Sequence, residues 1–544
     1  MPQTTIPLAG PFNTRQGITY ASAAKDLIIK GAYVDFMSDG ITQTSSAYLT
    51  KRFGIATVST IVASKSSTAI SVSADGRFCV AFSDGAVYFK NNVATAAVSV
   101  GTMVTKLPMY ITPAYINNET YFLISDNGTN GCYYLPVTAA TVVTPTFTAN
   151  TNTNTTLSNV SSFTGLFVGQ ALSGTDIAAG ARISSMDTGA STITMTAAAT
   201  GTTVGVTVTF SRLAKIIDAD FPSGVGGAFA FMDGYCFIMA SDGKIYNSAL
   251  NDPASWSANN YIQGSQAGSL AGNGYGVVRI KNRIVGMYSA NHEYYYNAGN
   301  ASGSPLSLIK ETSSNIGVYN FGICGDYVLF MGAPSSEQLI NCYLITAEGT
   351  KEISSPPISR DLSQGLTLTA TNISGGRAGG YDLFFLSDVS GSASWMYCIQ
   401  TNSWYETAFA ADYIFSGAPI AAGLYAVSTS DSVLYSASST TFQDAGSNFS
   451  VVYQSDLKSF NGGLPFIIDN INLLADTQST GSTTLATSAD DYANFGTVGS
   501  FDMTSPQKNL PCGGYYDTSV AFKLTHSANT AWRAQALVVT WRPA

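Results

Sequence analysis

The sequence predicts an all-β protein built on a β-propeller of six or seven blades. Seven segments share one pattern, in which an apolar run is followed by a polar turn and a Tyr-rich run. They start at residues 77, 121, 235, 283, 327, 381 and 424, so successive starts are separated by 44, 114, 48, 44, 54 and 43 residues. A hairpin that recurs at a period of roughly 40 to 50 residues is typical of a propeller. A large β-sandwich with unrelated hairpins is the alternative.

The two central hairpins give the clearest form of this pattern. Apolar runs at residues 235–239 and 283–288 are followed by aromatic runs at residues 244–246 and 293–296. The first turn is Ser241-Asp242-Gly243, in which Gly supplies a positive φ and Asp tolerates the left-handed region. We therefore expect two antiparallel strand pairs in tandem.

The 114-residue interval contains a segment of different composition. Residues 141–211 are rich in Thr, Ala and Gly and carry few charged side chains. Apolar positions that alternate with small or polar ones are Ile193, Met195, Val204, Val206, Val208 and Phe210. This period of two predicts half-buried strands, and hence a small all-β domain that is inserted into one repeat and projects from the propeller. A disordered low-complexity loop is the alternative.

Composition favours a soluble, β-rich protein. Hydrophobic residues make up 45% of the 544 residues, enough for a sizeable core, whereas charged residues make up only 11%. The formal net charge of −9 argues against a general nucleic-acid-binding protein, because affinity for phosphates comes mostly from clustered Lys and Arg. The seven scattered cysteines form no CxxC pair and are expected to be small buried hydrophobes.

No targeting or membrane segment is expected. The sequence contains no run of 18 apolar residues, and its amino terminus lacks the basic start and apolar core of a signal peptide. We therefore expect synthesis in a cytoplasm.

We expect three structural parts in five segments. Residues 56–140 and 212–446 form the propeller, and residues 141–211 form the inserted domain. Alternating strands in residues 447–544 predict a β-sandwich base, to which residues 1–55 add strands.

Histidines offer little for catalysis or metal binding. His292 and His526 fall in different predicted parts, so no His-based triad or His-rich metal site is expected. The run from His292 to Tyr296 could form an aromatic platform for a carbohydrate, but alternating Tyr residues are more typical of sheet packing.

Two carboxylate pairs could serve glycoside hydrolysis, namely Asp218 with Asp220 and Asp490 with Asp491. Both pairs stand in ordinary turn contexts, and near neighbours in sequence rarely supply such a pair. We find no P-loop, GxSxG, HExxH or EF-hand motif. The sequence thus predicts a protein that is not an enzyme, with no catalytic, cofactor-binding or metal-ligating residue.

Several segments match one known family. The matching positions are Gly243-Lys244, Asn251-Asp252-Pro253 with Trp256, and Tyr296-Asn297-Ala298-Gly299-Asn300. Through them the chain resembles the tail-hub, or packaged-DNA stabilisation, proteins of short-tailed bacteriophages, which are also called nozzle proteins. YLTKRFGI from Tyr48 is similar to an early Lys/Arg-Pro-Gly segment of that family, with Phe53 where Pro is usual. The likeness covers roughly residues 30–440 without the insertion.

The resemblance implies a virion structural protein of the phage tail. Such subunits form a ring, commonly a hexamer, below the portal and adaptor proteins, and the ring retains the genome and conducts it during ejection. Tail fibres or spikes and the host surface are further implied partners, and viral DNA passes through. Six chains of net charge −9 carry a formal charge of −54 together. If the bore of the ring is acidic or neutral, it would repel DNA phosphates and adhere only weakly to DNA. The residues that line the DNA channel are not assigned by the sequence.

Two other functions stay open. One is a receptor-binding or carbohydrate-binding tail protein, which requires an exposed aromatic groove on the insertion. The aromatic residues of that segment are Phe147, Phe163, Phe167 and Phe210. The other is a polysaccharide-degrading propeller, which requires two carboxylates within about 5 to 10 Å in a cleft.

Overall fold

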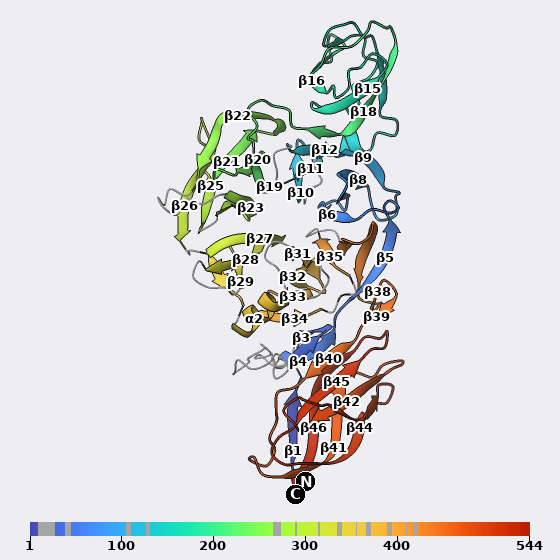
Figure 1. Cartoon of the computed structure of the whole chain (residues 1–544), viewed down its shortest axis with the longest axis vertical. Coiled ribbons are helices and arrows are strands. Elements are labelled where there is room, and N and C mark those ends of the chain that lie inside the picture. Colours follow the sequence, from blue (N-terminus) through green and yellow to red (C-terminus); the bar gives the residue numbers. More distant parts are fainter. Residues whose placement is uncertain are drawn as a thin grey trace.

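The chain forms three parts that follow one another along the longest axis of the molecule (Figure 1). The insertion lies at one end, a ring of sheets lies in the middle, and sheets that contain both termini lie at the other end. This computed structural model describes residues 1–8, 28–38, 45–104, 110–126, 131–264, 274–288, 291–313, 316–334, 340–354, 356–365, 371–388, 394–407, 409, 411–417 and 423–544.

The ring is a β-propeller, as predicted. Seven antiparallel units of four strands follow one another among the described residues, and their first strands surround the centre (Figure 1). In order from the centre outward, the units are β6 (Ser67–Val72), β7 (Phe78–Phe82), β8 (Ala86–Lys90) and β9 (Val98–Thr102); β10 (Tyr110–Ile116), β11 (Glu119–Ser125), β12 (Tyr133–Pro136) and the end of β18 (Val206–Lys215); β19 (Val225–Met232), β20 (Tyr235–Ala240), β21 (Lys244–Ala249) and β22 (Asp252–Gln263); β23 (Gly274–Ile280), β24 (Arg283–Tyr288), β25 (Asn291–Asn297) and β26 (Leu306–Ser313); β27 (Ile316–Cys324), β28 (Tyr327–Pro334), β29 (Asn341–Ile345) and β30 (Thr350–Glu352); β31 (Thr371–Ala378), β32 (Tyr381–Asp388), β33 (Ser394–Cys398) and β34 (Ser403–Glu406); and β35 (Tyr413–Gly417), β36 (Leu424–Ser428), β37 (Val433–Ser438) and β5 (Gly54–Thr60).

The seven hairpins predicted from the sequence are the second and third strands of these units. The predicted pair at residues 235–246, for example, is β20 with β21, and Gly243 in its turn has a φ of 84°. Their core-facing residues alternate with residues that pack on the next sheet, so both faces of these strands are largely buried. Burial on both faces explains why these strands are continuous apolar runs and do not alternate with polar residues.

Glycines allow the innermost strands to lie close together. Gly227 of β19 has a φ of 70°, and a Cβ atom placed on it would stand 3.0 Å from the Cα of Gly276 in β23. A Cβ atom on Gly322 of β27 would stand 2.7 Å from the carbonyl oxygen of Ile373 in β31. Larger residues at these positions would push neighbouring blades apart.

The ring is closed by a strand from the amino-terminal region. β5 pairs antiparallel with β37, and Ser59 lies opposite Leu434. The outer strand of the last unit therefore comes from a distant part of the sequence. β5 also crosses the boundary predicted between residues 55 and 56.

The insertion is an all-β body with a hydrophobic core of its own, which includes Leu157, Ile193 and Val208. Its elements are the short helix α1 (Val137–Ala140) at its base and the strands β13 (Thr146–Ala149), β14 (Thr156–Leu157), β15 (Gln170–Gly174), β16 (Ile183–Asp187), β17 (Thr192–Met195) and the first part of β18. One expectation is wrong: Val204 is exposed in a turn, because β18 begins only at Val206.

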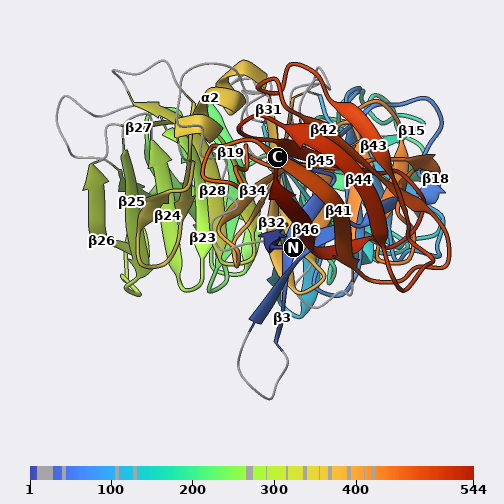
Figure 2. The same ribbon diagram turned by 90° about the horizontal axis from the view of Figure 1, so that it is seen from below.

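Strands from both ends of the chain pair in one sheet below the ring. This sheet contains β3 (Ala32–Ser38), β4 (Ser45–Lys51), β46 (Arg533–Pro543), β41 (Phe466–Ala475) and β44 (Asn509–Tyr516), with β1 (Gln3–Pro7) beside β46. A second sheet contains β2 (Ile28–Lys30), β40 (Val451–Gln454), β45 (Ala521–His526), β42 (Ser482–Ser488) and β43 (Gly496–Asp502). We call the two together the terminal sheets. Seen from below, they lie across one side of the ring (Figure 2).

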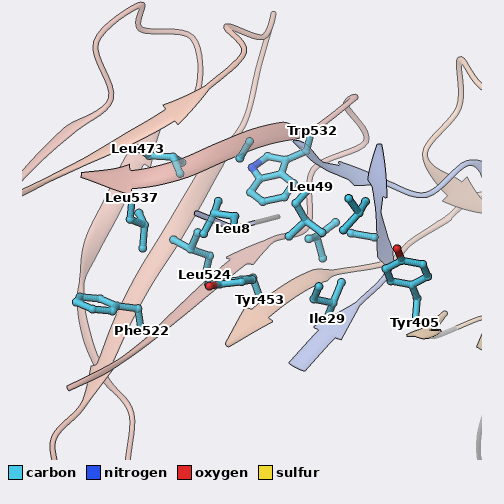
Figure 3. Packing of buried hydrophobic residues seen from close by; sticks show 14 of the residues in the cluster. Leu8, Ile29, Leu49, Tyr405, Tyr453, Leu473, Phe522, Leu524, Trp532 and Leu537 are labelled. Atoms are coloured by element: carbon cyan, nitrogen blue, oxygen red, sulfur yellow. The ribbon is translucent and has the colours of Figure 1, made fainter. Parts of the chain in front are cut away.

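The terminal sheets share one hydrophobic core with the ring. Trp532, Leu537 and Phe522 belong to the same buried cluster as Tyr405 of β34, and Figure 3 shows several of its members. β2 continues this link, because it pairs with β34 on one side and with β40 on the other. Two short strands, β38 (Gln443–Asp444) and β39 (Ser447–Asn448), connect the last unit to the terminal sheets.

Besides the short α1, a longer helix stands outside the predicted all-β pattern. α2 (Pro356–Gly365) packs between β29 and the sixth unit, where Ile358 and Leu362 are buried. It begins at a Pro pair, which suits the first turn of a helix.

Candidate functional site

The two histidines have structural surroundings. His292 is buried on β25, where its Nε2 bonds to the hydroxyl of Thr350 and its ring lies 6.1 Å from that of Phe330. It contributes to the contact between the fourth and fifth units. In the same run Tyr294 and Tyr295 are buried and serve sheet packing, whereas Tyr296 is exposed and stands alone there, so the run does not form an aromatic platform.

His526 lies in the terminal sheets, far from His292 in the fold. Its Nδ1 lies 3.1 Å from the carbonyl oxygen of Ser482 and its Nε2 lies 3.2 Å from the hydroxyl of Thr530. Burial and the positive charge of Lys51 lower the pKa of His526 to about 4. The imidazole is thus neutral at physiological pH.

The carboxylate pair at Asp218 and Asp220 organises a local turn. Asp218 accepts backbone N–H bonds from Asp220 at 3.0 Å and from Trp256 of β22 at 2.9 Å. The carboxylate therefore anchors the start of the third unit to its outer strand.

The pair at Asp490 and Asp491 also stands in a local turn. Asp490 accepts bonds from the backbone of Asn494 at 3.0 Å, from its side chain at 2.7 Å and from Ser488 at 2.7 Å. These bonds lower the pKa of Asp490 to about 2. The two predicted pairs lie in different parts of the fold, and within the described residues no group of three or more His, Cys, Asp or Glu side chains could hold a metal ion.

Side chains meet across the centre of the ring. Tyr110 at the start of β10 stacks on Phe321 of β27, with 6.0 Å between ring centroids and 7° between ring planes. These two strands belong to the second and fifth units. The middle of the single-chain ring is thus occupied by aromatic side chains at this level.

The most unusual electrostatic feature is the junction between the ring and the terminal sheets. Arg52 is fully buried, and its Nη1 and Nη2 donate to the two carboxylate oxygens of Asp444 at 2.9 and 2.5 Å. Its Nε donates to the carbonyl oxygen of Thr407 at 2.7 Å. Burial lowers the pKa of Arg52, and the bond to Asp444 opposes that shift.

Aromatic side chains complete this junction. The Cζ atom of Arg52 lies 3.6 Å from the ring centroid of Phe449 and 4.2 Å from that of Phe409. The buried Nζ of Lys51 lies 4.5 Å from the Phe449 centroid and donates to the carbonyl oxygen of Ala528 at 2.7 Å. Burial, and then the charge of Arg52, lower the pKa of Lys51 to about 8.

The insertion is joined to the ring by a continuous strand and by contacts of residues 167–169. β18 runs without a break from the insertion into the second unit, where Tyr134 lies opposite Ala214. The hydroxyl of Tyr134 donates to the carbonyl oxygen of Val168 at 2.5 Å. Gly169 approaches β18 so closely that a Cβ atom on it would stand 1.8 Å from the carbonyl oxygen of Lys215.

The aromatic residues of the insertion face inward. Phe147 and Phe210 are buried and pack on each other, with 6.4 Å between ring centroids. Phe163 and Phe167 are half-buried, and Phe167 packs on Tyr121 of the ring. None of the four belongs to an exposed aromatic groove.

The buried junction was not identified as a site from the sequence. Arg52 was noted only within the segment YLTKRFGI, and Asp444 stands 392 positions later in a polar stretch without periodicity. The sequence signal for this junction is the adjacent pair Lys51 and Arg52 before an apolar strand. Cations that become fully buried need a partner, so such a pair predicts an acidic residue nearby in the fold.

Fold and contacts together define a β-propeller that carries two further β parts. No family model matches the chain, and a search of curated proteins found no match. Among solved structures, it is similar to a chain of a mitotic checkpoint complex, with 9% identity over 71% of this chain and 94% of that one and a TM-score of 0.37. A structure of YCF48 bound to a D1 peptide gives 9% identity, coverage of 72% and 97%, and a TM-score of 0.37. The amino-terminal domain of Nup159 is 8% identical over 75% of this chain and 98% of that one, with a TM-score of 0.36.

Among the helices of the described residues, none is long and apolar enough to cross a membrane.

Proposed function

We propose that this chain is a structural subunit of the tail of a short-tailed bacteriophage. Several copies form the nozzle ring that retains the genome and conducts it during ejection, docked to the portal and adaptor proteins and in contact with tail fibres. The observation that carries the proposal is that each of the two outer parts is joined to the ring by buried contacts or by a continuous strand, which suits a mechanical role. A shared core and a buried ion pair hold the terminal sheets, and a continuous strand holds the insertion.

The centre of the ring supports a particular form of this proposal. Because Tyr110 and Phe321 stack across the propeller, the DNA conduit lies between copies of the chain and not along the axis of one propeller. Low charge suits a conduit wall, because each Lys–phosphate contact would add adhesion to moving DNA.

The test is the mass of the purified full chain, alone and after mixing with the portal–adaptor complex of its phage. We expect a closed ring of copies on the adaptor. A chain that ignores the adaptor but binds host-surface glycan would overturn the proposal and favour the receptor-binding alternative.

A further inference from the structure

An apolar patch lies where the first unit of the ring meets the base of the insertion. Val143 is 91% exposed, Val98 is exposed at the start of β9, and Val93 is exposed in the segment before that strand. The guanidinium of Arg212 joins these segments, because it donates at 3.2 Å both to the carbonyl oxygen of Val143 and to that of Ser99. We call these three valines the valine patch.

A second apolar surface lies on β22, the outer strand of the third unit, and on β25 and β26 of the fourth unit. Tyr296 is 46% exposed and Leu308 is 43% exposed. Ile309 and Tyr261 are 41% and 37% exposed. In the described residues β26 pairs only with β25, so its outer edge has backbone groups open to a partner. We call these four residues the β22–β26 rim.

The two surfaces match in charge. Residues 91–104 beside the valine patch contain no charged side chain, and neither do residues 253–264 and 298–309 of the β22–β26 rim. Arg212 stands at the edge of the valine patch, where its guanidinium donates to the carbonyl oxygens of Val142, Val143 and Ser99. At the rim, exposed Asp233 accepts a hydrogen bond from Asn297 beside Tyr296, and Lys244, which pairs with Asp242, lies 5.1 Å from the centroid of the Tyr261 ring. Contact would thus bury neutral apolar groups and bring the cation of Arg212 near the carboxylate of Asp233.

Their positions favour contact between identical chains. β9 and β18 lie on one side of the ring and β22 and β26 on the other (Figure 1), and Figure 2 also shows β18 and β26 on opposite sides. Two unlike patches on opposite sides of one chain give a head-to-tail contact, which closes into a ring when the rotation between copies allows it. We propose that the valine patch of one copy packs on the β22–β26 rim of the next. This inference rests on the proposed function and names the surfaces through which the nozzle subunits meet.

The test uses one charged variant of each surface in the full chain, Val143→Glu and Leu308→Glu. Each is expected to weaken self-association at least about tenfold, because a carboxylate would be buried without a partner. Each variant keeps one intact surface, so an equimolar mixture is expected to form one-to-one dimers and to stop there. Native mass spectrometry, with and without the portal–adaptor complex, measures the species.

Val204→Glu is the matched control, because Val204 is 81% exposed on the insertion but belongs to neither surface. It is expected to associate as the wild type does, and circular dichroism checks that all three variants are folded. Folded Val143→Glu and Leu308→Glu chains that form the wild-type ring would overturn this inference and leave the proposed function standing. Wild-type chains that never associate, even on the adaptor, would overturn the proposed function itself.

Discussion

The insertion and the terminal sheets are attached to the same ring in different ways. The insertion has its own hydrophobic core and reaches the ring through the continuous strand β18, close backbone contacts at Gly169 and the side chain of Phe167. The terminal sheets share a core with the last units and add the buried pair of Arg52 and Asp444. The first attachment keeps two cores separate, whereas the second makes one cooperative body from two parts.

Deletion of each part tests this comparison most strongly. Removal of residues 146–209, which joins Pro145 to Phe210, is expected to leave the ring folded, because these two residues are already linked by a 2.9 Å backbone hydrogen bond. Removal of residues 449–544 is expected to prevent folding, because it exposes the apolar side chains of the shared core. Soluble yield and circular dichroism distinguish the two. A ring that fails to fold without the insertion would contradict the separation of the cores.

The buried ion pair should have the next largest effect. Asp444→Ala leaves Arg52 buried without its carboxylate and is expected to lower the free energy of unfolding by about 3 to 5 kcal/mol. Asp476→Ala is the matched control, since it breaks the exposed pair with Arg533 and should cost less than about 1 kcal/mol. Urea unfolding measures both, and equal effects would show that the junction does not depend on this pair.

Close backbone approach at the insertion is tested with two glycines. Gly169→Ala is expected to destabilise the insertion by roughly 3 kcal/mol, because its φ is 87° and the added Cβ would collide with Lys215. Gly180→Ala shares a positive φ of 80° but has no atom within 4 Å of the added Cβ, so it should cost about 1 kcal/mol. Hydrogen exchange of the insertion compares them. Similar losses of stability in the two variants would mean that the positive φ, and not the collision of the added Cβ with Lys215, accounts for the cost at both positions.

Acid should weaken the terminal sheets through His526. The unfolded chain takes up a proton on this residue near pH 6.5, but the folded chain does so only near pH 4. This contribution to stability is therefore complete above pH 6.5 and is lost as the pH falls to about 4, with a total on the order of 3 kcal/mol. His526→Gln is expected to lack this loss, so the difference between the two pH profiles measures it. Parallel profiles would contradict a buried neutral histidine.

Local chemistry explains which parts of the ring were predictable. The hairpin at β20 and β21 joins an apolar run, a turn with Gly at positive φ and an aromatic run, and each signal acts within a few residues. Inner strands such as β19 and β31 were missed, because the glycines that let blades approach also remove the alternation that indicates a strand. α2 was missed because tertiary packing of a short segment decided its conformation.

The sequence by itself determined the propeller class, the repeat of its middle strands and the presence of an inserted β part, because these depend on turn residues and on a period of two. Only the tertiary structure decided how the parts join. The pairing of β5 with β37 and the bond between Arg52 and Asp444 link residues that are hundreds of positions apart. Such contacts leave no periodic signal, since each partner is selected by the space and charge that the folded chain places beside it.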